Sequence, residues 1–284
     1  MLGEAISVLT ALLWAGSTVI LAKTLKNIDP LNVNAFKTLF ASVGMLPVAF
    51  IMGEMQSIPR VDPYGLFAVV VAALIGFGIG DTCLLKSMTQ IGVSRSYTIA
   101  YAYPFFTMLL ATAVLGEQFL LRYLIGTAAI FLGIINLIIT ADGKVGGGSW
   151  KGLLTAFAAA LSWAVGTIVV SLGLRKIDAV LANTIRYPLL FVFLLLLSQP
   201  WARKPDLNRR NLLLLLASGV LGMTLGGVTF LLGIQMIGTS RTVSLSSSSP
   251  IWASLMVSFF LKERVTLRLL VSSVLVVLGI YFLT

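Results

Sequence analysis

The stretch Ala11-Leu-Leu-Trp-Ala-Gly-Ser-Thr18 recurs in the second half of the chain as Ala160-Leu-Ser-Trp-Ala-Val-Gly-Thr167. Apolar residues match by chance in an apolar chain, but this chain has only five tryptophans, and Trp14 falls on Trp163. Self-similarity at a fixed spacing is the sequence sign of a repeated architecture. The match therefore divides the chain into two related halves.

The register of the two halves continues well beyond the tryptophans. It aligns Asn34 with Asn183, Lys37 with Arg186 and, after a three-residue deletion, Gly76 with Gly222, Gly80 with Gly226, Pro104 with Pro250 and Glu117 with Glu263. Polar residues, prolines and glycines in one register are not a product of apolar composition. The sequence predicts a first repeat at 1–141, a linker at 142–150 and a second repeat at 151–284.

The composition is that of a membrane protein. Of the 284 residues, 58% are hydrophobic and 11% are charged, against about 25% charged in a soluble domain, and the mean hydropathy is +1.01. The net charge of +10 comes from basic residues scattered between apolar runs, which is typical of side chains that reach lipid head groups. A nucleic-acid binder would gather them on one patch. We expect a multi-pass protein of the plasma or inner membrane, surrounded by lipids.

Apolar runs of about 20 residues predict ten transmembrane helices. They lie near 4–22, 32–52, 65–85, 95–115, 119–140, 151–173, 180–198, 211–233, 241–261 and 265–283. Each half holds five spans, so the second half must enter the membrane from the opposite side. The expected fold is an all-α polytopic membrane protein made of two inverted five-helix repeats. Inverted repeats are typical of transporters that bind solute near the membrane midplane.

The motifs also resemble a known family, the EamA-like transporters of the drug/metabolite transporter superfamily. The resemblance covers 4–283 and rests on Leu12-Leu-Trp-Ala-Gly16, Gly92-Val-Ser-Arg-Ser96, Pro104, Leu115-Gly-Glu117, Ser162-Trp163, Gly238-Thr-Ser-Arg241, Pro250 and Leu261-Lys-Glu263. It implies a secondary transporter of a small organic solute, such as an amino acid, a related metabolite or an amphipathic compound. It also implies export as the direction of transport.

Asp81 is the sharpest candidate for function, because ionisable residues inside membrane spans are costly and usually face a cavity or a partner. It ends the stretch Gly76-Phe-Gly-Ile-Gly-Asp81, and the register places Gly227 opposite it. An acid in a water-accessible cavity can take up and release protons, so Asp81 is a candidate for coupling transport to a proton gradient. The alternatives are a structural ion pair, for instance with Lys37, and transport by facilitated diffusion.

Four further residues are candidates for binding solute. Lys37 and Arg186, each within the second span of its half, would attract an anionic group such as a carboxylate. Alternatively, each side chain reaches the nearer membrane interface. Trp14 and Trp163 lie too deep for an interfacial aromatic belt, and therefore form either the helix core or the walls of a central cavity.

Tyr101 and Ser247 are the last two predicted binding residues. Pro104 and Pro250 remove the helical hydrogen bonds to the carbonyls of Ala100 and Ser246. Tyr97 shares a helix face with Tyr101, and the run Ser246–Ser249 supplies hydroxyls in the second half. These groups would suit a polar or amphipathic solute, whereas small serines are also favoured in plain helix packing.

The residue counts exclude several chemistries. The chain has no histidine and one cysteine, which excludes imidazole bases, His metal sites and thiolate clusters, and no phosphate loop is present. We therefore expect no catalytic residue, no metal and no cofactor, and solute, lipids and protons as partners. Glu117 and Glu263 are expected to hold turns. The rival function is a membrane-embedded enzyme acting on a lipid or lipid-linked substrate, which would need a cluster of acids at one interface.

Overall fold

The computed structural model describes residues 1–21, 28–91, 96, 99–138, 149–198, 207–260 and 267–284. All regular elements in these ranges are helical, which confirms the all-α class. Six of the described helices are long and apolar enough to cross a membrane, and shorter apolar helices lie at Tyr103–Leu115, Leu121–Asn136 and Leu267–Leu283. The count of ten spans and their inverted arrangement remain predictions.

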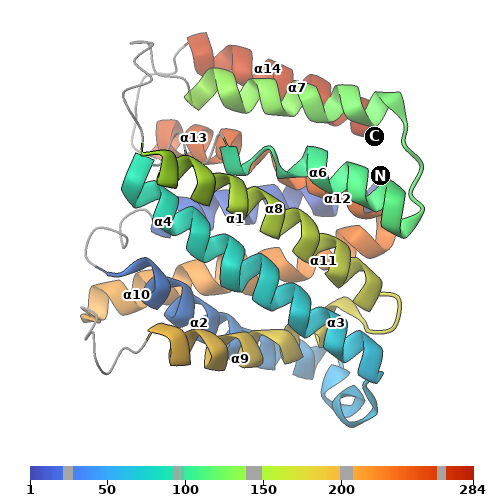
Figure 1. Ribbon diagram of the computed structural model, residues 1–284, viewed down its shortest axis with the longest axis vertical. Helices are drawn as coiled ribbons and strands as arrows, with labels where there is room; N and C mark the ends of the chain where they lie inside the picture. The colour runs from blue at the N-terminus through green and yellow to red at the C-terminus, as the bar shows by residue number, and fades with distance from the viewer. Residues whose placement is uncertain (22–27, 92–95, 97–98, 139–148, 199–206, 261–266) are drawn as a thin grey trace.

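The first half contains two long helices, an interrupted one and several shorter ones (Figure 1). Its elements are α1 (Leu2–Leu21), α2 (Pro30–Ile51), η1 (Glu54–Arg60), α3 (Pro63–Ala73), η2 (Leu74–Asp81), α4 (Thr82–Ile91), α6 (Tyr103–Leu110), η3 (Ala111–Leu115) and α7 (Leu121–Ile138). α3, η2 and α4 run on as one apolar stretch, Pro63–Ile91.

The second half has the same order of long, long, interrupted and short helices. Its elements are α8 (Trp150–Gly173), α9 (Ala179–Ser198), α10 (Arg209–Ser218), η4 (Gly219–Leu225), α11 (Gly226–Ile237), α12 (Thr239–Ser246), α13 (Ser249–Phe260) and α14 (Leu267–Leu283). Most of the predicted linker, 142–148, and the candidates Tyr97 and Glu263 lie outside the described residues.

Acidic and amide side chains fix where several helices begin. The Asp29 carboxylate accepts a hydrogen bond from the backbone N–H of Leu31, and the Asp62 carboxylate accepts one from Gly65, at the first turns of α2 and α3. Both acids are followed by proline, which needs no hydrogen-bond partner at the first helical position. These caps set the register in which α2 and α3 present their polar residues to the interior.

Helices from the two halves pack against each other throughout the molecule. α2 packs on α9, α1 on α11, α3 on α8, and α7 on α14. In Figure 1, α7 and α14 lie together at one end, α2 and α9 lie at the opposite end, and the interrupted helices run between them. The centre of the molecule is therefore built from both halves.

Glycines allow the closest of these helix approaches. A Cβ atom on Gly126 would lie 2.8 Å from the carbonyl oxygen of Gly279, and one on Gly133 would lie 3.0 Å from that of Ser272. α7 and α14 therefore touch backbone to backbone, as small residues permit in membrane helices.

Both interrupted helices contain a π-helical segment that is rich in glycine. η2 includes Gly76, Gly78 and Gly80, and η4 includes Gly219 and Gly222. π-helical turns inside α-helices often mark functional sites. Here each segment lies beside a tryptophan of the other half. An added Cβ atom on Gly80 of η2 would lie 2.7 Å from Cδ1 of Trp163, and one on Gly226, the residue that follows η4, would lie 2.7 Å from Cδ1 of Trp14.

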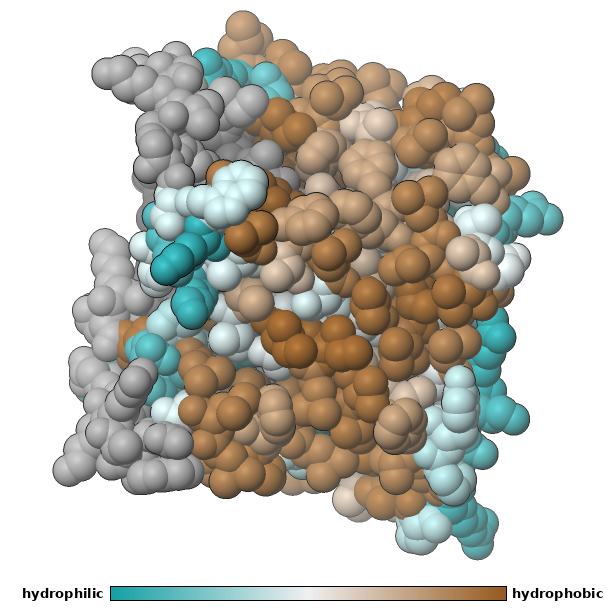
Figure 2. Space-filling model, in the orientation of Figure 1, coloured by the Kyte–Doolittle hydropathy of each residue, from teal (hydrophilic) through white to brown (hydrophobic). Residues whose placement is uncertain are grey.

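The surface has the distribution of a protein in a bilayer. Figure 2 shows an apolar belt across the middle of the visible face, with hydrophilic residues at its two edges. Large apolar side chains such as Phe50, Phe67 and Leu196 are more than 60% exposed on the outside of the helices. Lipid tails are the solvent that suits such a surface.

Candidate functional site

A cavity of about 420 Å³ lies at the centre of the molecule, between the interrupted helices and their partners. It is large enough for one small organic molecule. Of the predicted site residues, six line it: Trp14, Lys37, Asp81, Tyr101, Trp163 and Arg186. The lining extends to Leu21, Met88 and Thr89 near the C-terminal ends of α1 and α4, the end drawn at the left of Figure 1.

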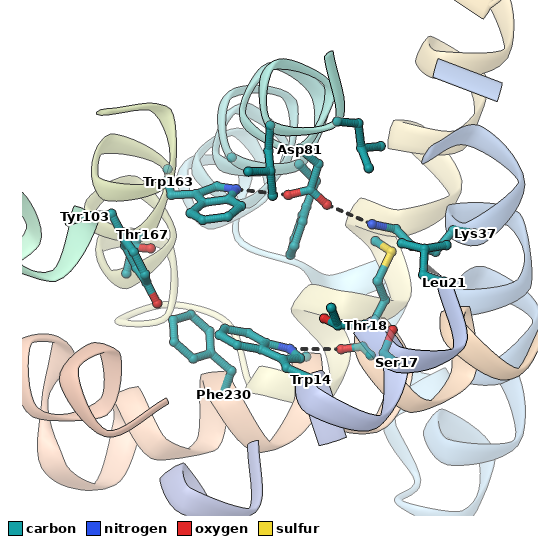
Figure 3. A pocket seen from close by; sticks show the side chains of 18 of the residues that line it. Trp14, Ser17, Thr18, Leu21, Lys37, Asp81, Tyr103, Trp163, Thr167 and Phe230 are labelled. Carbon is teal, nitrogen blue, oxygen red and sulfur yellow. Dashed lines mark hydrogen bonds and ion pairs between the residues drawn. The ribbon is translucent and has the colours of Figure 1, made fainter. Parts of the chain in front are cut away.

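Asp81 is held by two partners from different helices (Figure 3). The Lys37 ammonium on α2 lies 2.8 Å from one carboxylate oxygen, and the Trp163 indole N–H on α8 donates to the other at 2.9 Å. Lys37 therefore does not extend to the membrane interface, because its ammonium finds a carboxylate within the helix packing. The geometry is that of the ion pair considered as the alternative for Asp81, and both charges line the cavity.

Neighbouring polar groups complete this network in the first half. The Asn34 amide, one turn before Lys37 on α2, donates to the carbonyl of Phe77 at 2.8 Å and to the Thr82 hydroxyl at 3.3 Å. A π-helical segment disturbs the regular bonding of its carbonyls, and Asn34 supplies a donor to one of them. α2 and η2 are therefore joined by a charged pair and by amide hydrogen bonds.

Arg186 on α9 occupies a different environment. It is 3% exposed, and its guanidinium carbon lies 5.2 Å from the ring centroids of both Phe77 and Tyr187. Its one hydrogen bond from the guanidinium within the described chain is a long contact of 3.5 Å to the Tyr187 hydroxyl, and its Nε is buried without a partner. No described carboxylate lies within ion-pair distance of it.

The two predicted tryptophans form facing walls of the cavity (Figure 3). The Trp14 indole N–H donates to the carbonyl of Gly222 in η4 at 3.0 Å, and its ring lies 5.1 Å from Phe230. Trp163 stands edge-on to Tyr103 at 5.4 Å. Both indole N–H groups are thus already paired with protein, so the rings offer their apolar surfaces to the cavity.

The structure places Tyr101 and Ser247 in different environments. Tyr101 lines the cavity, and its hydroxyl forms a 2.8 Å hydrogen bond with that of Ser249. Ser247 does not line the cavity: it is 2% exposed, and its hydroxyl donates to the carbonyl of Ser244 at 2.7 Å. That Ser247 contacts solute stays a prediction, and in this structure its hydroxyl turns back onto the backbone of α12.

Several lining residues were not singled out from the sequence as solute contacts. They are chiefly aromatic, and include Phe77, Tyr103 and Phe230, together with Gly227. Aromatic residues are common in an apolar chain, so no local pattern distinguishes those that face inward. The repeat register gave the one usable signal, because it placed Gly227 opposite Asp81.

Glu117 holds a helix end, as expected of a structural residue. Its carboxylate accepts hydrogen bonds from the backbone N–H groups of Thr239 and Ser240 and from the Ser240 hydroxyl, at 2.5, 2.9 and 2.6 Å. A carboxylate at a helix N-terminus satisfies otherwise unpaired N–H groups and the helix dipole. This contact joins the first half to the start of α12.

Among the described residues, no group of three Asp, Glu or Cys side chains lies close enough together to hold a metal ion. The three charged side chains that line the cavity are Lys37, Asp81 and Arg186. Charged side chains of both signs therefore face the cavity.

Comparison with known proteins gives consistent matches. The model of the EamA-like transporter family matches residues 1–139 and 150–284. An uncharacterized transporter of Archaeoglobus fulgidus is 29% identical over 285 residues, covering 100% of this chain and 98% of the relative. Uncharacterized transporter YcbK of Bacillus subtilis is 27% identical over 142 residues, which are 48% of this chain and 45% of that protein.

A solved crystal structure has the same fold. It matches with a TM-score of 0.83 over 99% of this chain and 96% of the other, at 17% sequence identity. At this sequence identity the match shows that the two chains share a fold, and it says nothing about which solute either one binds.

Proposed function

Because the chain belongs to the EamA-like transporter family, we propose that this multi-pass membrane protein moves one small organic solute through its central cavity by alternating access. The solute class is an amino acid or a related metabolite, and the direction is export. The observation that supports this most directly is the cavity itself. It lies among helices of both halves, is walled by Trp14 and Trp163, and contains three charged side chains.

Alternating access needs two halves that can exchange equivalent conformations. Several matched contacts support such a relation. Gly3 of α1 packs on Ile237 of α11, and Gly152 of α8 packs on Ile91 of α4. In the repeat register Gly3 corresponds to Gly152, and Ile91 corresponds to Ile237. We infer that the two halves are inverted repeats of five spans, and that the interrupted helices change their relative positions during transport.

We propose that Asp81 couples transport to the movement of protons. When its carboxylate is ionised, it holds Lys37 and Trp163 and ties η2 to α2 and α8. Protonation would remove the charge that Lys37 faces and loosen these helices from one another. A proton taken up from one side of the membrane would therefore favour one arrangement of the cavity.

The test is solute flux into proteoliposomes that contain the purified protein. Labelled amino acids and related metabolites are offered with and without an imposed pH gradient. We expect uptake above that of empty liposomes, increased by a gradient, and loss of the gradient effect in Asp81→Asn. Because this variant leaves Lys37 unpaired, the double variant Lys37→Met/Asp81→Asn serves as the second test, with folding checked by thermal unfolding.

The outcomes separate the alternatives. Flux that ignores the gradient in the parent protein would leave a facilitator and remove the coupling role of Asp81. No flux of any solute by folded protein, together with turnover of a lipid in detergent, would overturn the transporter in favour of the lipid enzyme. Efflux from loaded vesicles of known protein orientation tests the proposed direction.

A further inference from the structure

We propose that Arg186 binds a carboxylate group of the transported solute, and that the cavity selects a monoanion with an aromatic or apolar body. This inference rests on the transporter function proposed above and narrows its solute class from amino acids and related metabolites to metabolites that carry one carboxylate and no ammonium group. It starts from a difference between the two basic residues that line the cavity, Lys37 and Arg186. One has its counter-ion within the described chain, and the other has none.

The guanidinium of Arg186 is buried, cationic and incompletely hydrogen-bonded. It has five N–H donors, yet its Nε has no partner, and its contact with the Tyr187 hydroxyl is long. The rings of Phe77 and Tyr187 stabilise the cation but accept no conventional hydrogen bond. A buried charge without a partner is costly. The planar fork of arginine matches a carboxylate, which would remove that cost.

The second half lacks the acid that the first half supplies. The register places Gly227 opposite Asp81, and Gly227 also lines the cavity. A Cβ atom at this position would overlap the Tyr187 hydroxyl, which itself donates to the carbonyl of Met223 at 2.9 Å. The packing around Gly227 therefore leaves no room for an acidic side chain at this position beside Tyr187. No described residue brings a carboxylate to Arg186, and the cavity is the route by which a carboxylate of the solute reaches it.

The charge of the cavity favours an anion over a cation. Lys37 and Asp81 neutralise each other, so the three charged lining residues leave one net positive charge, on Arg186. Both oxygens of Asp81 are engaged, one by Lys37 and the other by Trp163. An ammonium group in the solute would therefore find no free carboxylate, whereas a single carboxylate would find a free guanidinium.

The approach to the cavity is also basic. The cavity extends to Met88 and Thr89 of α4. Lys86 of α4 is exposed at this end, and so is Lys151 at the start of α8, beside the α4 end that Gly152 contacts. Positive charges around an entrance raise the local concentration of anions. We infer that solute enters the cavity at this end, where the two lysines would attract the same anion that Arg186 binds.

The rest of the cavity suits a flat, apolar body. Trp14 with Phe230 and Trp163 with Tyr103 provide aromatic surfaces on facing sides (Figure 3). The indole N–H groups are already paired with Gly222 and Asp81, so these walls contribute apolar contact more than hydrogen bonding. A carboxylate on Arg186 with a ring between the tryptophans uses both features.

Three probes that share one ring and differ in charge test the inference. Phenylacetate, phenylacetamide and phenethylamine carry charges of −1, 0 and +1 at neutral pH. Their binding to the purified full-length protein in detergent is measured by isothermal titration calorimetry. We expect phenylacetate to bind at least about tenfold more tightly than the amide, and the amine to bind more weakly than both. Arg186→Gln removes the preference for phenylacetate, and Arg186→Lys restores part of it.

Arg60→Gln is the matched control, because it makes the same chemical change at an exposed position outside the cavity lining. Its preference for phenylacetate should equal that of the parent protein. Thermal unfolding confirms that each variant is folded. If Arg186→Gln does not fold, Arg186→Lys still decides the matter, since a charge that is retained without the planar fork should weaken phenylacetate binding and leave phenylacetamide binding unchanged.

Several results would overturn the inference. They are failure of phenylacetate to bind, equal binding of acid and amide, and an unchanged preference in folded Arg186→Gln. Flux of cationic or neutral solutes that is insensitive to Arg186→Gln would remove the carboxylate site and leave the transporter intact. If the protein binds the carboxylate only when Arg186 is present but moves no solute, the carboxylate site stands and the transporter function falls.

Discussion

Two contacts between helices, that of α2 with η2 and that of α9 with η4, are named the first and the second crossing. Corresponding residues of the two halves form different interactions in them. In the first crossing, Lys37 pairs with Asp81 and the Asn34 amide donates to the carbonyl of Phe77. In the second, Tyr187 donates to the carbonyl of Met223, while Nε of Arg186 and both amide atoms of Asn183 are buried without a partner among the described residues, as is Oδ1 of Asn34 in the first.

This difference separates the packing that the two halves share from the polar interactions that they do not. Roles in packing are repeated in both crossings, since each π-helical segment lies beside a tryptophan from the other half. The polar chemistry is not repeated. The first crossing satisfies its own charges, whereas the second leaves a cation facing the cavity, which is the arrangement expected where a ligand supplies the missing partner. The following predictions break or sharpen this comparison.

The largest effect is expected from Asp81→Asn in the first crossing. It leaves the ammonium of Lys37 buried without a counter-ion, a change that costs about 3–5 kcal/mol in buried pairs. The measurement is chemical or thermal unfolding of the purified protein in detergent. The double variant Lys37→Met/Asp81→Asn should recover most of the loss. If Asp81→Asn unfolds like the parent protein, the ion pair contributes nothing, and the asymmetry of the crossings has no energetic content.

The second prediction makes the two crossings chemically alike. Gly227→Asp with Tyr187→Thr installs the acid of the first half, and the threonine, which corresponds to Thr38, makes room for it. The new carboxylate should pair with Arg186 and compete with the carboxylate of phenylacetate. We expect its affinity to fall about a hundredfold, or about 2.7 kcal/mol.

Titration calorimetry with phenylacetate measures this change, and Tyr187→Thr alone is the control for the altered packing. Phenylacetamide should bind the double variant nearly as it binds the control. A double variant that is folded and binds phenylacetate as tightly as the control does would contradict the view that Gly227 leaves Arg186 open for solute.

A smaller contrast is expected between the paired asparagines. Asn34→Ala removes hydrogen bonds to Phe77 and Thr82 and should cost about 1–3 kcal/mol, because a buried carbonyl loses its donor. Both side-chain polar atoms of Asn183 are buried without partners among the described residues. Asn183→Ala therefore removes no hydrogen bond, and relief from burying the amide offsets the lost packing, so stability should change by less than about 1 kcal/mol.

Unfolding midpoints of the two variants in the same detergent test this contrast. Equal losses would show that Asn183 has partners in solution. Unchanged stability of Asn183→Ala with reduced flux would indicate that the amide is used in another conformation, where it would donate to the carbonyl of Met223 as Asn34 does to that of Phe77.

The all-α class was predictable from the sequence because its signals are local or periodic: apolar runs identify the helices. The matched Trp14 and Trp163 predict two related halves, and both tryptophans line the cavity, whereas ten spans in two inverted repeats stay a prediction. Six of the seven predicted site residues line that cavity. Ser247 does not, because a serine on a helix can bond to its own backbone as readily as to a solute.

What the sequence left open depends on distances between helices. The pairing of Lys37 with Asp81, rather than with the membrane interface, follows from the approach of η2 to α2. The isolation of Arg186 depends on Tyr187, which fills the space opposite Gly227. Neither fact is encoded in spacing along the chain. The unmatched pair of Asp81 and Gly227 was the one sequence feature that marked where the halves differ.

The smallest predicted effect concerns the two tryptophans. Trp163 donates to a carboxylate and Trp14 donates to a backbone carbonyl. Hydrogen bonds to charged groups are worth about 1.5–3 kcal/mol, against about 0.5–1.5 kcal/mol for neutral ones. Replacement by phenylalanine keeps an aromatic ring and removes each donor, so Trp163→Phe should cost about 1 kcal/mol more than Trp14→Phe in the same unfolding measurement.

The difference should disappear in the Lys37→Met/Asp81→Asn background, where the carboxylate is gone and both indoles face neutral acceptors. If it persists there, it arises from ring packing at Gly80 and Gly226, which each tryptophan contacts in the same way. Comparing the two tryptophan variants in both backgrounds therefore separates the charged hydrogen bond of Trp163 from the packing that the two halves share. The comparison also measures how much of the asymmetry between the crossings depends on the carboxylate of Asp81.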